Sequence, residues 1–385
     1  MNNGNLGFGM MRLPVINGEQ TNIDYGKLFP MVDAYLESGY RYFDTSYVYH
    51  SGASEEAVRR AVTERYPRER YLVATKFPTF LNPPEEQVEP IFDSQLKKLG
   101  VEYADYYLLH NIQTLSYDGV DGKGGVVQSS RLFEHLAEWK SAGRIRHIGF
   151  SFHSSAKLLD RVLTEHPEVE FVQLAVNYID WDSEMVQAKE CCETVRRHGK
   201  KLIIMEPVKG GALASLPPKA EAILKAELPE ASIASWAFRF LASLDNDIIA
   251  VLSGMSTLEQ VRDNIGTMKS ASPLTPRQEA ALRQAIALYR ESAPITPETI
   301  EKYRGLKYLG LPATALLQTY GICRIQPVPS FADDLNYPGN MMAEEMHRDM
   351  FGAEPFEEET VVLPDGTDGT PLLKEAVEWL RHHHF

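Results

Sequence analysis

The sequence predicts an α/β fold, a (β/α)₈ barrel of the TIM type in which eight parallel strands close into a ring inside a layer of helices. Two observations predict it. Over the first two-thirds of the chain, short β-type runs alternate with amphipathic helical segments, which is the pattern of parallel βα units. The alternation contains eight strand-like runs, and a barrel of this kind takes about 250 of the 385 residues.

The expected strands are short runs of apolar, aromatic and β-branched residues, most of them bounded by polar residues or glycine. Several end in a polar residue, as strands do when they deliver side chains to the carboxyl-end mouth of a parallel barrel. The strands are expected at residues 6–9, around Tyr42, and at 71–75, 105–109, 145–150, 171–176, 201–205 and 248–252.

Helices are expected between these strands, with recognisable starts and stops. Ser54 is expected to cap the helix that follows it. Gly100, Gly143 and Gly199 each stand where a helix should stop ahead of a strand, because glycine adopts the left-handed conformation that ends many helices. The main helices are expected at residues 24–38, 54–64, 85–99, 132–141 and 183–198.

The last quarter of the chain differs in character from the barrel. We expect the barrel, with a closing helix at 275–289, to occupy residues 1–289, and residues 290–385 to form a mostly helical C-terminal extension. Within the extension, residues 354–370 are acidic and loop-like, and the chain closes on an amphipathic helix.

Composition excludes several classes of function. A formal net charge of −14 and a pI near 5.3 argue against binding to nucleic acid or to an anionic membrane. No apolar run approaches the roughly 18 to 20 residues of a membrane span, and the chain start lacks a basic segment followed by an apolar core, so we expect a cytoplasmic protein.

Cysteine and histidine usage predicts no metal site. Cys191 and Cys192 are adjacent and Cys323 is distant, which gives neither a disulfide framework nor a metal spacing, so these cysteines are expected to be reduced and structural. The three histidines at 382–384 are expected to be solvated, because consecutive helical positions do not converge on one ion.

Four side chains at the ends of three successive strand-like runs predict proton-transfer chemistry. They are Asp44, Tyr49, Lys76 and His110. A tyrosine releases its proton near pH 10, so a tyrosine acid is expected to need a cation such as Lys76 beside it to lower that pKa. Asp44 would keep the lysine charged in a closed pocket, and His110 would orient a substrate oxygen.

Eight strings that occur in order give the chain a resemblance to the aldo-keto reductase superfamily over residues 1 to about 290. The resemblance implies that Tyr49 is the general acid, that Lys76 and Asp44 tune it, and that His110 steers the carbonyl. The strings are LGFGMMRLP, FDTSYVYHSGASEE, VATK, YYLLHN, GRIRHIGFSFH, VQLAVNYID, MEPVKGGAL and SGMSTLEQVRDN.

The resemblance also implies a nicotinamide cofactor. Ser151 and Gln173 match the residues that hold the nicotinamide amide, and Met205 stands where the ring-stacking residue is commonly aromatic. NADP(H) is the family default, but Gly254 and Gln260 replace basic residues that often grip its 2′-phosphate, so NAD(H) stays open. The other cofactor positions are Gly9, Met10, Asp44, Pro207, Val208, Lys209, Gly211, Ser256 and Asn264.

In its extension the chain looks like the branch of the superfamily that carries a ferredoxin-like module with iron–sulfur clusters. Cys323 is the one cysteine after residue 290, so no cluster can be ligated by cysteine, and we interpret residues 290–385 as a degenerate module without an Fe–S cluster that shapes the substrate pocket.

The leading functional hypothesis is an NAD(P)-dependent oxidoreductase that acts on the carbonyl or secondary alcohol of a small molecule. Alternatives are a redox-neutral epimerase or isomerase that keeps its cofactor bound, and a non-catalytic cofactor-sensing module. Aromatic residues expected to face the substrate would suit a sugar or another ring compound. Besides His110, the substrate candidates are Tyr47, His153, Tyr178 and Trp181.

Overall fold

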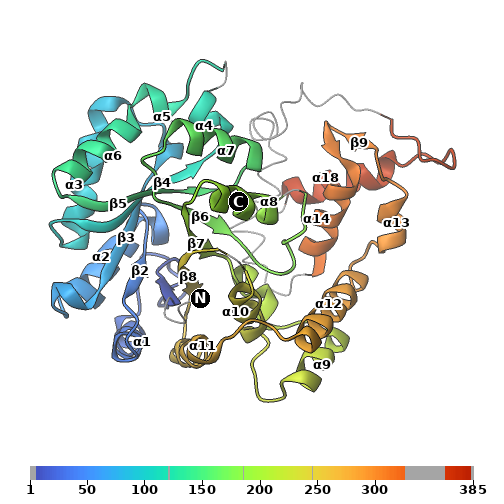
Figure 1. The fold of residues 1–385 in the computed structure, drawn as a ribbon, viewed down its shortest axis with the longest axis horizontal. Coiled ribbons are helices and arrows are strands. Elements are labelled where there is room, and N and C mark those ends of the chain that lie inside the picture. Colours follow the sequence, from blue (N-terminus) through green and yellow to red (C-terminus); the bar gives the residue numbers. More distant parts are fainter. Residues whose placement is uncertain (1–5, 120–121, 185, 245, 326–359, 383–385) are drawn as a thin grey trace. The chain divides into compact units, whose positions relative to one another are not determined.

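The structure is a computed structural model that describes residues 6–119, 122–184, 186–244, 246–325 and 360–382 (Figure 1). Its contacts divide the chain into two compact units. The first comprises Met1–Val176, Lys189–Pro207 and Leu241–Ser272, and the second comprises Asn177–Ala188, Val208–Phe240 and Pro273–Phe385. The sequence predicts a domain boundary at residue 289. A division of the chain by contacts does not test where one domain ends and the next begins, so this boundary stays a prediction.

The first unit is built around a closed barrel of eight strands, which confirms the predicted fold class. Each strand pairs in parallel with its neighbours, and β1 closes the ring against β8 with Gly9 opposite Gly254. The strands are β1 (Leu6–Gly9), β2 (Tyr42–Asp44), β3 (Leu72–Phe77), β4 (Ala104–Ile112), β5 (Ile145–Phe152), β6 (Phe171–Ala175), β7 (Lys201–Met205) and β8 (Ile248–Gly254).

Helices cover the outside of the barrel strands, as Figure 1 shows for α1, α2 and α3. Each buries an apolar stripe and exposes a polar one, as the sequence periodicity requires. The helices that lie wholly or largely in this unit are α1 (Tyr25–Glu37), α2 (Ser54–Val58), α3 (Val88–Leu99), α4 (Thr114–Asp118), α5 (Val126–Ser129), α6 (Leu132–Ser141), α7 (Ala156–Glu165), α8 (Ala188–Arg197) and α11 (Leu258–Ser270).

Three expectations about helices were wrong in detail. The segment 54–64 is not one α-helix, because a π-helical turn (Arg59–Thr63) follows α2. Ser54 does not cap α2 either, since the N-cap is Ala53 and the buried Ser54 hydroxyl donates to the Met10 carbonyl oxygen at 2.9 Å. The helix expected at 183–198 begins only at Ala188.

The barrel interior is filled by side chains, so it is a packed core and not a pore. Phe171 lies opposite Gly149, where an added Cβ would stand 2.5 Å from the phenyl ring. The glycine is therefore required by close packing at this position. The interior layer consists of Tyr42, Ala74, Leu108, Phe171, Ile203, Ala250 and Leu252.

The second unit is mostly helical and has two apolar clusters. One gathers around Trp236 and Tyr289, and the other around Leu316, Leu373 and Leu380. A two-stranded antiparallel sheet joins β9 (Lys307–Tyr308) to β10 (Leu311–Pro312). The helices are α9 (Pro218–Glu227), most of α10 (Ser235–Ala242), α12 (Pro276–Glu291), α13 (Pro297–Glu301), α14 (Ala313–Ile325) and α18 (Thr370–His382).

Cysteines and ligand-type side chains show no cluster in the described part of the chain. Cys191, Cys192 and Cys323 are free and buried. Within the described ranges, no three His, Cys, Asp or Glu side chains gather as metal ligands would. The side chains of residues 382–384 lie outside the described residues. None of the helices that the structure describes has the length and apolar character to cross a membrane.

Candidate active site

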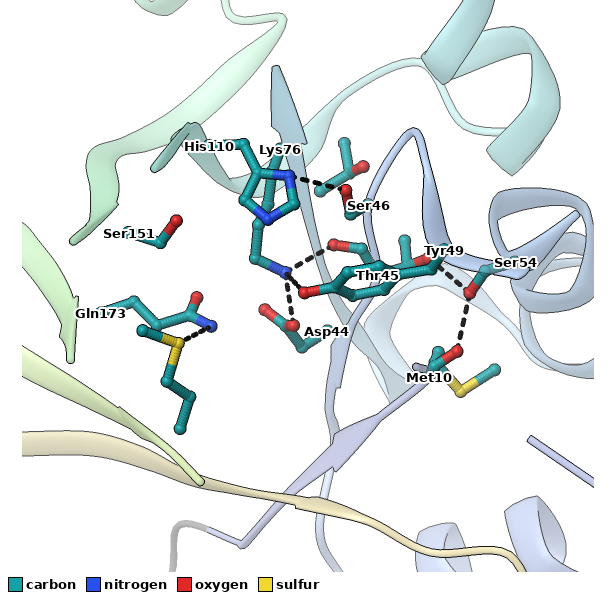
Figure 2. A network of polar contacts seen from close by, with 12 residues as sticks. Met10, Asp44, Thr45, Ser46, Tyr49, Ser54, Lys76, His110, Ser151 and Gln173 are labelled. Atoms are coloured by element: carbon teal, nitrogen blue, oxygen red, sulfur yellow. Dashed lines mark hydrogen bonds and ion pairs between the residues drawn. The ribbon is translucent and has the colours of Figure 1, made fainter. Parts of the chain in front are cut away.

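Lys76 is the centre of a buried polar cluster at the carboxyl-end mouth of the barrel (Figure 2). Its Nζ donates to Asp44 Oδ1 at 2.6 Å, to the Thr45 carbonyl oxygen at 2.8 Å and to the Tyr49 hydroxyl at 3.1 Å. The Lys76 side chain is fully buried and that of Asp44 is 3% exposed. The ammonium group thus has three oxygen partners that offset its removal from water.

Local structure explains how residues of different strands meet here. Asp44 is the last residue of β2, and Lys76 lies near the end of β3, beside it in the barrel. Tyr49 then begins a 3₁₀ turn in which His50 and Ser51 both have positive φ angles, of 52° each. Left-handed backbone is unfavourable for these residues, so the turn holds local strain where it places the tyrosine ring.

The electrostatics of the cluster favour a protonated tyrosine. Burial raises the pKa of Tyr49 above its ordinary value, and the charge of Lys76 opposes this effect without reversing it. Lys76 thus lowers the tyrosine pKa, but by less than burial raises it. Burial also disfavours the charged form of Lys76, but Asp44 and Tyr49 outweigh it, and the pKa of Lys76 is raised. The cluster holds a charged lysine beside a phenol that keeps its proton at neutral pH.

His110 is placed by an irregularity in β4. The register of β4 against β5 shifts between Leu109 and Ile112, and Asn111 has a φ angle of 65°. The Thr79 hydroxyl donates to the His110 carbonyl oxygen, and the imidazole Nδ1 lies 3.0 Å from Ser46 Oγ. Burial lowers the pKa of His110 well below its ordinary value, and the positive charge of Lys76 acts in the same direction. The imidazole is neutral at physiological pH.

Ser151 and Gln173 face each other across β5 and β6. Ser151 Oγ accepts a hydrogen bond from the Asn111 N–H at 2.8 Å. Gln173 Nε2 contacts Met205 Sδ at 3.6 Å, whereas its buried Oε1 has no partner among the residues that the structure describes. Buried amide oxygens are normally paired, so this atom calls for a donor from outside the chain. An amide N–H of a carboxamide ligand would supply one.

The ends of β1 and β8 and the start of α11 bring together five of the other predicted cofactor positions. Arg12 packs on Gly254, where an added Cβ would lie 3.2 Å from the arginine side chain, and the Ser256 hydroxyl donates to the Arg12 carbonyl oxygen at 2.8 Å. Gln260 Oε1 accepts from the Ser256 N–H at 2.7 Å, and Asn264 Nδ2 donates to the Ser253 hydroxyl at 2.9 Å. Gly9 lies opposite Gly254 in the barrel.

The remaining predicted residues of the first unit are spread around the mouth. Met10 is fully buried and its N–H donates to the Asp44 carbonyl oxygen at 2.8 Å. The Lys98 ammonium lies over the Tyr47 ring, with Nζ 4.4 Å from the ring centroid. Burial lowers the pKa of His153 to about 4. Pro207 is the last residue of the segment Lys189–Pro207, which contains β7 and belongs to this unit.

Other predicted residues belong to the second unit. Lys209 is buried and its Nζ donates to Asp180 Oδ2 at 2.7 Å, so its charge is already paired within that unit. Tyr178 is buried in an apolar cluster with Trp236, and Trp181 packs edge-on against Phe240. Val208 and Gly211 lie in the same unit.

Three residues of the site were not predicted from the sequence. Ser46 contacts His110, and Arg12 supplies a cation beside Gly254. Glu206 has a φ angle of 55°, and its charge contributes to raising the Tyr49 pKa. Arg12 carried a signal, since it is a basic residue three positions after the first strand, but Ser46 and Glu206 had none in their local pattern.

Comparison with known proteins places this barrel and its polar mouth in a family. Residues 5–287 match the model of the aldo/keto reductase family. The chain belongs to the aldo/keto reductase family. A curated aldo-keto reductase of Mycolicibacterium vanbaalenii is 30% identical over 272 residues, which are 70% of this chain and 87% of that protein.

Solved structures of aldo/keto reductases share the fold. The enzyme from Bacillus halodurans in its holo form superposes with a TM-score of 0.55 at 21% identity, over 73% of this chain and 91% of that one. The enzyme from Klebsiella pneumoniae in complex with NADPH gives a TM-score of 0.56 at 16% identity, over 74% and 90% of the two chains. The family match ends at residue 287 and leaves the extension outside it.

Proposed function

We propose that this aldo/keto reductase is an NAD(P)-dependent oxidoreductase that interconverts a carbonyl and a secondary alcohol. One observation carries the proposal: Lys76 Nζ contacts both the Asp44 carboxylate and the Tyr49 hydroxyl, in a buried cluster beside the neutral His110. This is an arrangement for moving one proton to or from a substrate oxygen. Family membership supports the same reading.

Each residue has a distinct part in the proposed reaction. In reduction Tyr49 gives its hydroxyl proton to the carbonyl oxygen, and in oxidation it takes the proton back. The charge of Lys76 stabilises the phenolate left behind, and Asp44 keeps that lysine ionised and fixed in place. His110 binds the same oxygen and orients it. When bound, the nicotinamide cofactor supplies or accepts the hydride.

The cofactor assignment rests on the amide-binding end of the site. Gln173 Oε1 is buried without a described partner, and Ser151 has a hydroxyl on the neighbouring strand, so together they would hold a nicotinamide carboxamide. We propose NADP(H) as the cofactor, supported by the NADPH complex of the Klebsiella enzyme. NAD(H) is the alternative, because Gly254 and Gln260 are themselves uncharged and Arg12 is the cation that the structure places beside Gly254.

The finer parts of the proposal concern the substrate and the extension. We propose a small carbonyl or alcohol compound, such as a sugar or another ring, with His153 and Tyr47 among the residues near it. Residues 290–385 would derive from a ferredoxin-like module that has lost its cluster, since Cys323 is the single cysteine after residue 290. The proposed location is the cytoplasm, in keeping with the acidic composition.

The first test is to identify what the purified protein carries and which nucleotide it binds. Released small molecules would be analysed by mass spectrometry, and NADH and NADPH would be titrated by fluorescence. Exchangeable NADPH together with turnover on a panel of carbonyls would support the oxidoreductase. A cofactor that is never released, with turnover that needs no added nucleotide, would favour the epimerase instead. Binding of nucleotide without turnover on any carbonyl or alcohol would overturn both.

A further inference from the structure

Among the residues that the structure describes, the imidazole of His110 has one hydrogen-bond partner, and it lies on the side of Nδ1. Ser46 Oγ is 3.0 Å from this nitrogen. Ser46 follows β2 and His110 lies near the end of β4, so the contact joins positions 64 apart in the sequence. Figure 2 shows the other ring nitrogen turned toward the side where Lys76 and Tyr49 present their polar ends.

The hydrogen-bond partners of Ser46 Oγ decide which atom donates in its contact with His110. A serine hydroxyl carries one hydrogen and two lone pairs. The Val48 N–H makes a long contact of 3.5 Å with Oγ, in which the serine can only accept. Among the residues that the structure describes, His110 Nδ1 is the one acceptor within reach of the hydroxyl hydrogen, and the side chain is fully buried. An imidazole hydrogen on Nδ1 would leave a buried hydroxyl hydrogen unpaired.

The protonation state of His110 completes the assignment. The ring is neutral at physiological pH, because burial and the nearby charge of Lys76 disfavour its cation. A neutral imidazole has one hydrogen bound to nitrogen, and that hydrogen is on the nitrogen that does not accept a hydrogen bond. If Nδ1 accepts from Ser46, the hydrogen is on Nε2, the atom that faces the tyrosine and lysine.

We propose that Ser46 is a positioning residue that holds His110 as the Nε2–H tautomer, so that the histidine presents a donor to the substrate oxygen. The inference rests on the proposed oxidoreductase function and adds a residue to it. The opposite tautomer would present a lone pair to the carbonyl oxygen and repel it. Without the Ser46 hydroxyl, both tautomers become accessible, and only a fraction of the molecules can bind the carbonyl productively.

The tautomer can be observed directly. The full-length protein would be labelled with ¹⁵N at histidine, and long-range ¹H–¹⁵N correlation spectra would show which nitrogen carries the hydrogen. The signals of His110 are assigned as those absent from His110→Gln. We expect protonated Nε2 and bare Nδ1 in the wild type, and a mixture or the reverse tautomer in Ser46→Ala. Protonated Nδ1 in the wild type would overturn the proposal and needs no variant to fold.

Kinetics separates positioning from loss of structure. Ser46→Ala is expected to lower kcat/KM for carbonyl reduction about tenfold while the Kd for NADPH stays the same, since one charge-free hydrogen bond is lost. Ser46→Thr keeps the hydroxyl and should restore the Nε2–H tautomer. The control is Ser130→Ala, a buried serine whose hydroxyl donates to the Pro83 carbonyl oxygen at 2.6 Å, which should leave the tautomer unchanged.

The failure of this inference differs from the failure of the proposed function. A wild type that reduces carbonyls, with an unchanged tautomer and rate in Ser46→Ala, would overturn the role of Ser46 and leave the oxidoreductase intact. A wild type that reduces no carbonyl, with a tautomer that still depends on Ser46, would support the hydrogen-bond assignment and remove the function built on it.

Discussion

Lys76 Nζ lies 2.6 Å from Asp44 Oδ1, in an ion pair whose two side chains are 0% and 3% exposed. Such a pair adds little net stability, because the cost of removing two charges from water offsets most of their attraction. The ion pair has a use other than stability, because the same ammonium contacts the Tyr49 hydroxyl at 3.1 Å. The pair therefore fixes a positive charge at the point where a phenolate would form.

Removal of the lysine is expected to leave a buried carboxylate without its partner. We predict that Lys76→Met lowers the free energy of unfolding by about 3–5 kcal/mol at pH 7. The double variant with Asp44→Asn should lose less than the two single variants together, because the second change removes the uncompensated charge. Urea unfolding of the four proteins measures this coupling. Strict additivity would show that the two side chains act independently.

Replacement of Tyr49 by phenylalanine removes the proton that the proposed reaction transfers. We expect Tyr49→Phe to lower kcat by at least about 100-fold and to leave the Kd of the nicotinamide cofactor unchanged. The control is Tyr40→Phe, whose buried hydroxyl has no partner in the described part of the chain and which precedes β2 at the opposite end of the barrel. Near-normal turnover by Tyr49→Phe would assign the proton transfer to another group.

Gln173 offers a test of cofactor binding that stability measurements can separate. Gln173→Leu should weaken cofactor binding about tenfold through the loss of a hydrogen-bonded carboxamide partner. The same variant should be as stable as the wild type or more so, because its buried Oε1 has no described partner. Gln95→Leu should instead lose stability, since both ends of that buried amide are hydrogen-bonded. Unchanged cofactor affinity in Gln173→Leu would contradict the proposed nicotinamide position.

His153 predicts how stability depends on pH. Its pKa is about 4 in the folded protein, because burial disfavours the charged ring. In the unfolded chain the pKa of a histidine is about 6.5, so between these values the unfolded state binds more protons. The stabilisation is fully present above about pH 6.5, and up to about 3 kcal/mol is lost as the pH falls toward 4. His110 acts in the same direction.

The pH prediction is checked by urea unfolding at several values between pH 4.5 and about 7.5. His153→Gln should show a shallower slope of unfolding free energy against pH than the wild type. An equal slope in the two proteins would mean that His153 is accessible to water and titrates normally.

Packing at the interior of the barrel gives a pair of matched glycine variants. In Gly149→Ala the new Cβ would stand 2.5 Å from the Phe171 ring and 2.6 Å from its carbonyl oxygen, so we expect a loss of about 1–3 kcal/mol. In Gly266→Ala, within α11, the new Cβ meets nothing within 4 Å, and a gain of about 0.5–1 kcal/mol is expected. Thermal or urea unfolding compares them. Equal effects would show that β5 can move away from Phe171.

The barrel could be predicted from the sequence because the signals for its strands and helices lie within short segments of the chain. Each strand and helix has its own period of apolar residues, and parallel strands must end at the same edge, so Asp44, Lys76 and His110 could be placed at one mouth before any distance was known. Helix ends at Gly100, Gly143 and Gly199 were predictable for the same reason, and all three have positive φ angles.

The details that the sequence could not give depend on backbone irregularities and long-range contacts. The π-helical turn after α2 leaves the apolar pattern almost unchanged, so it was expected to be α-helix. The burial of Ser54 against the Met10 carbonyl depends on how the β1 loop returns, which no helix-cap signal encodes. Lys209, which is expected at the cofactor, pairs with Asp180, 29 positions away, and no local pattern predicts that ion pair.

By itself, then, the sequence determined the fold class, the order of the strands and the identity of the side chains at their ends. The tertiary structure decided which of those side chains touch and what charge each one holds. The approach of Ser46 to His110 and the balance of burial against Lys76 at Tyr49 exist only once the barrel closes. Closure is what removes these groups from water, and their protonation follows from that removal.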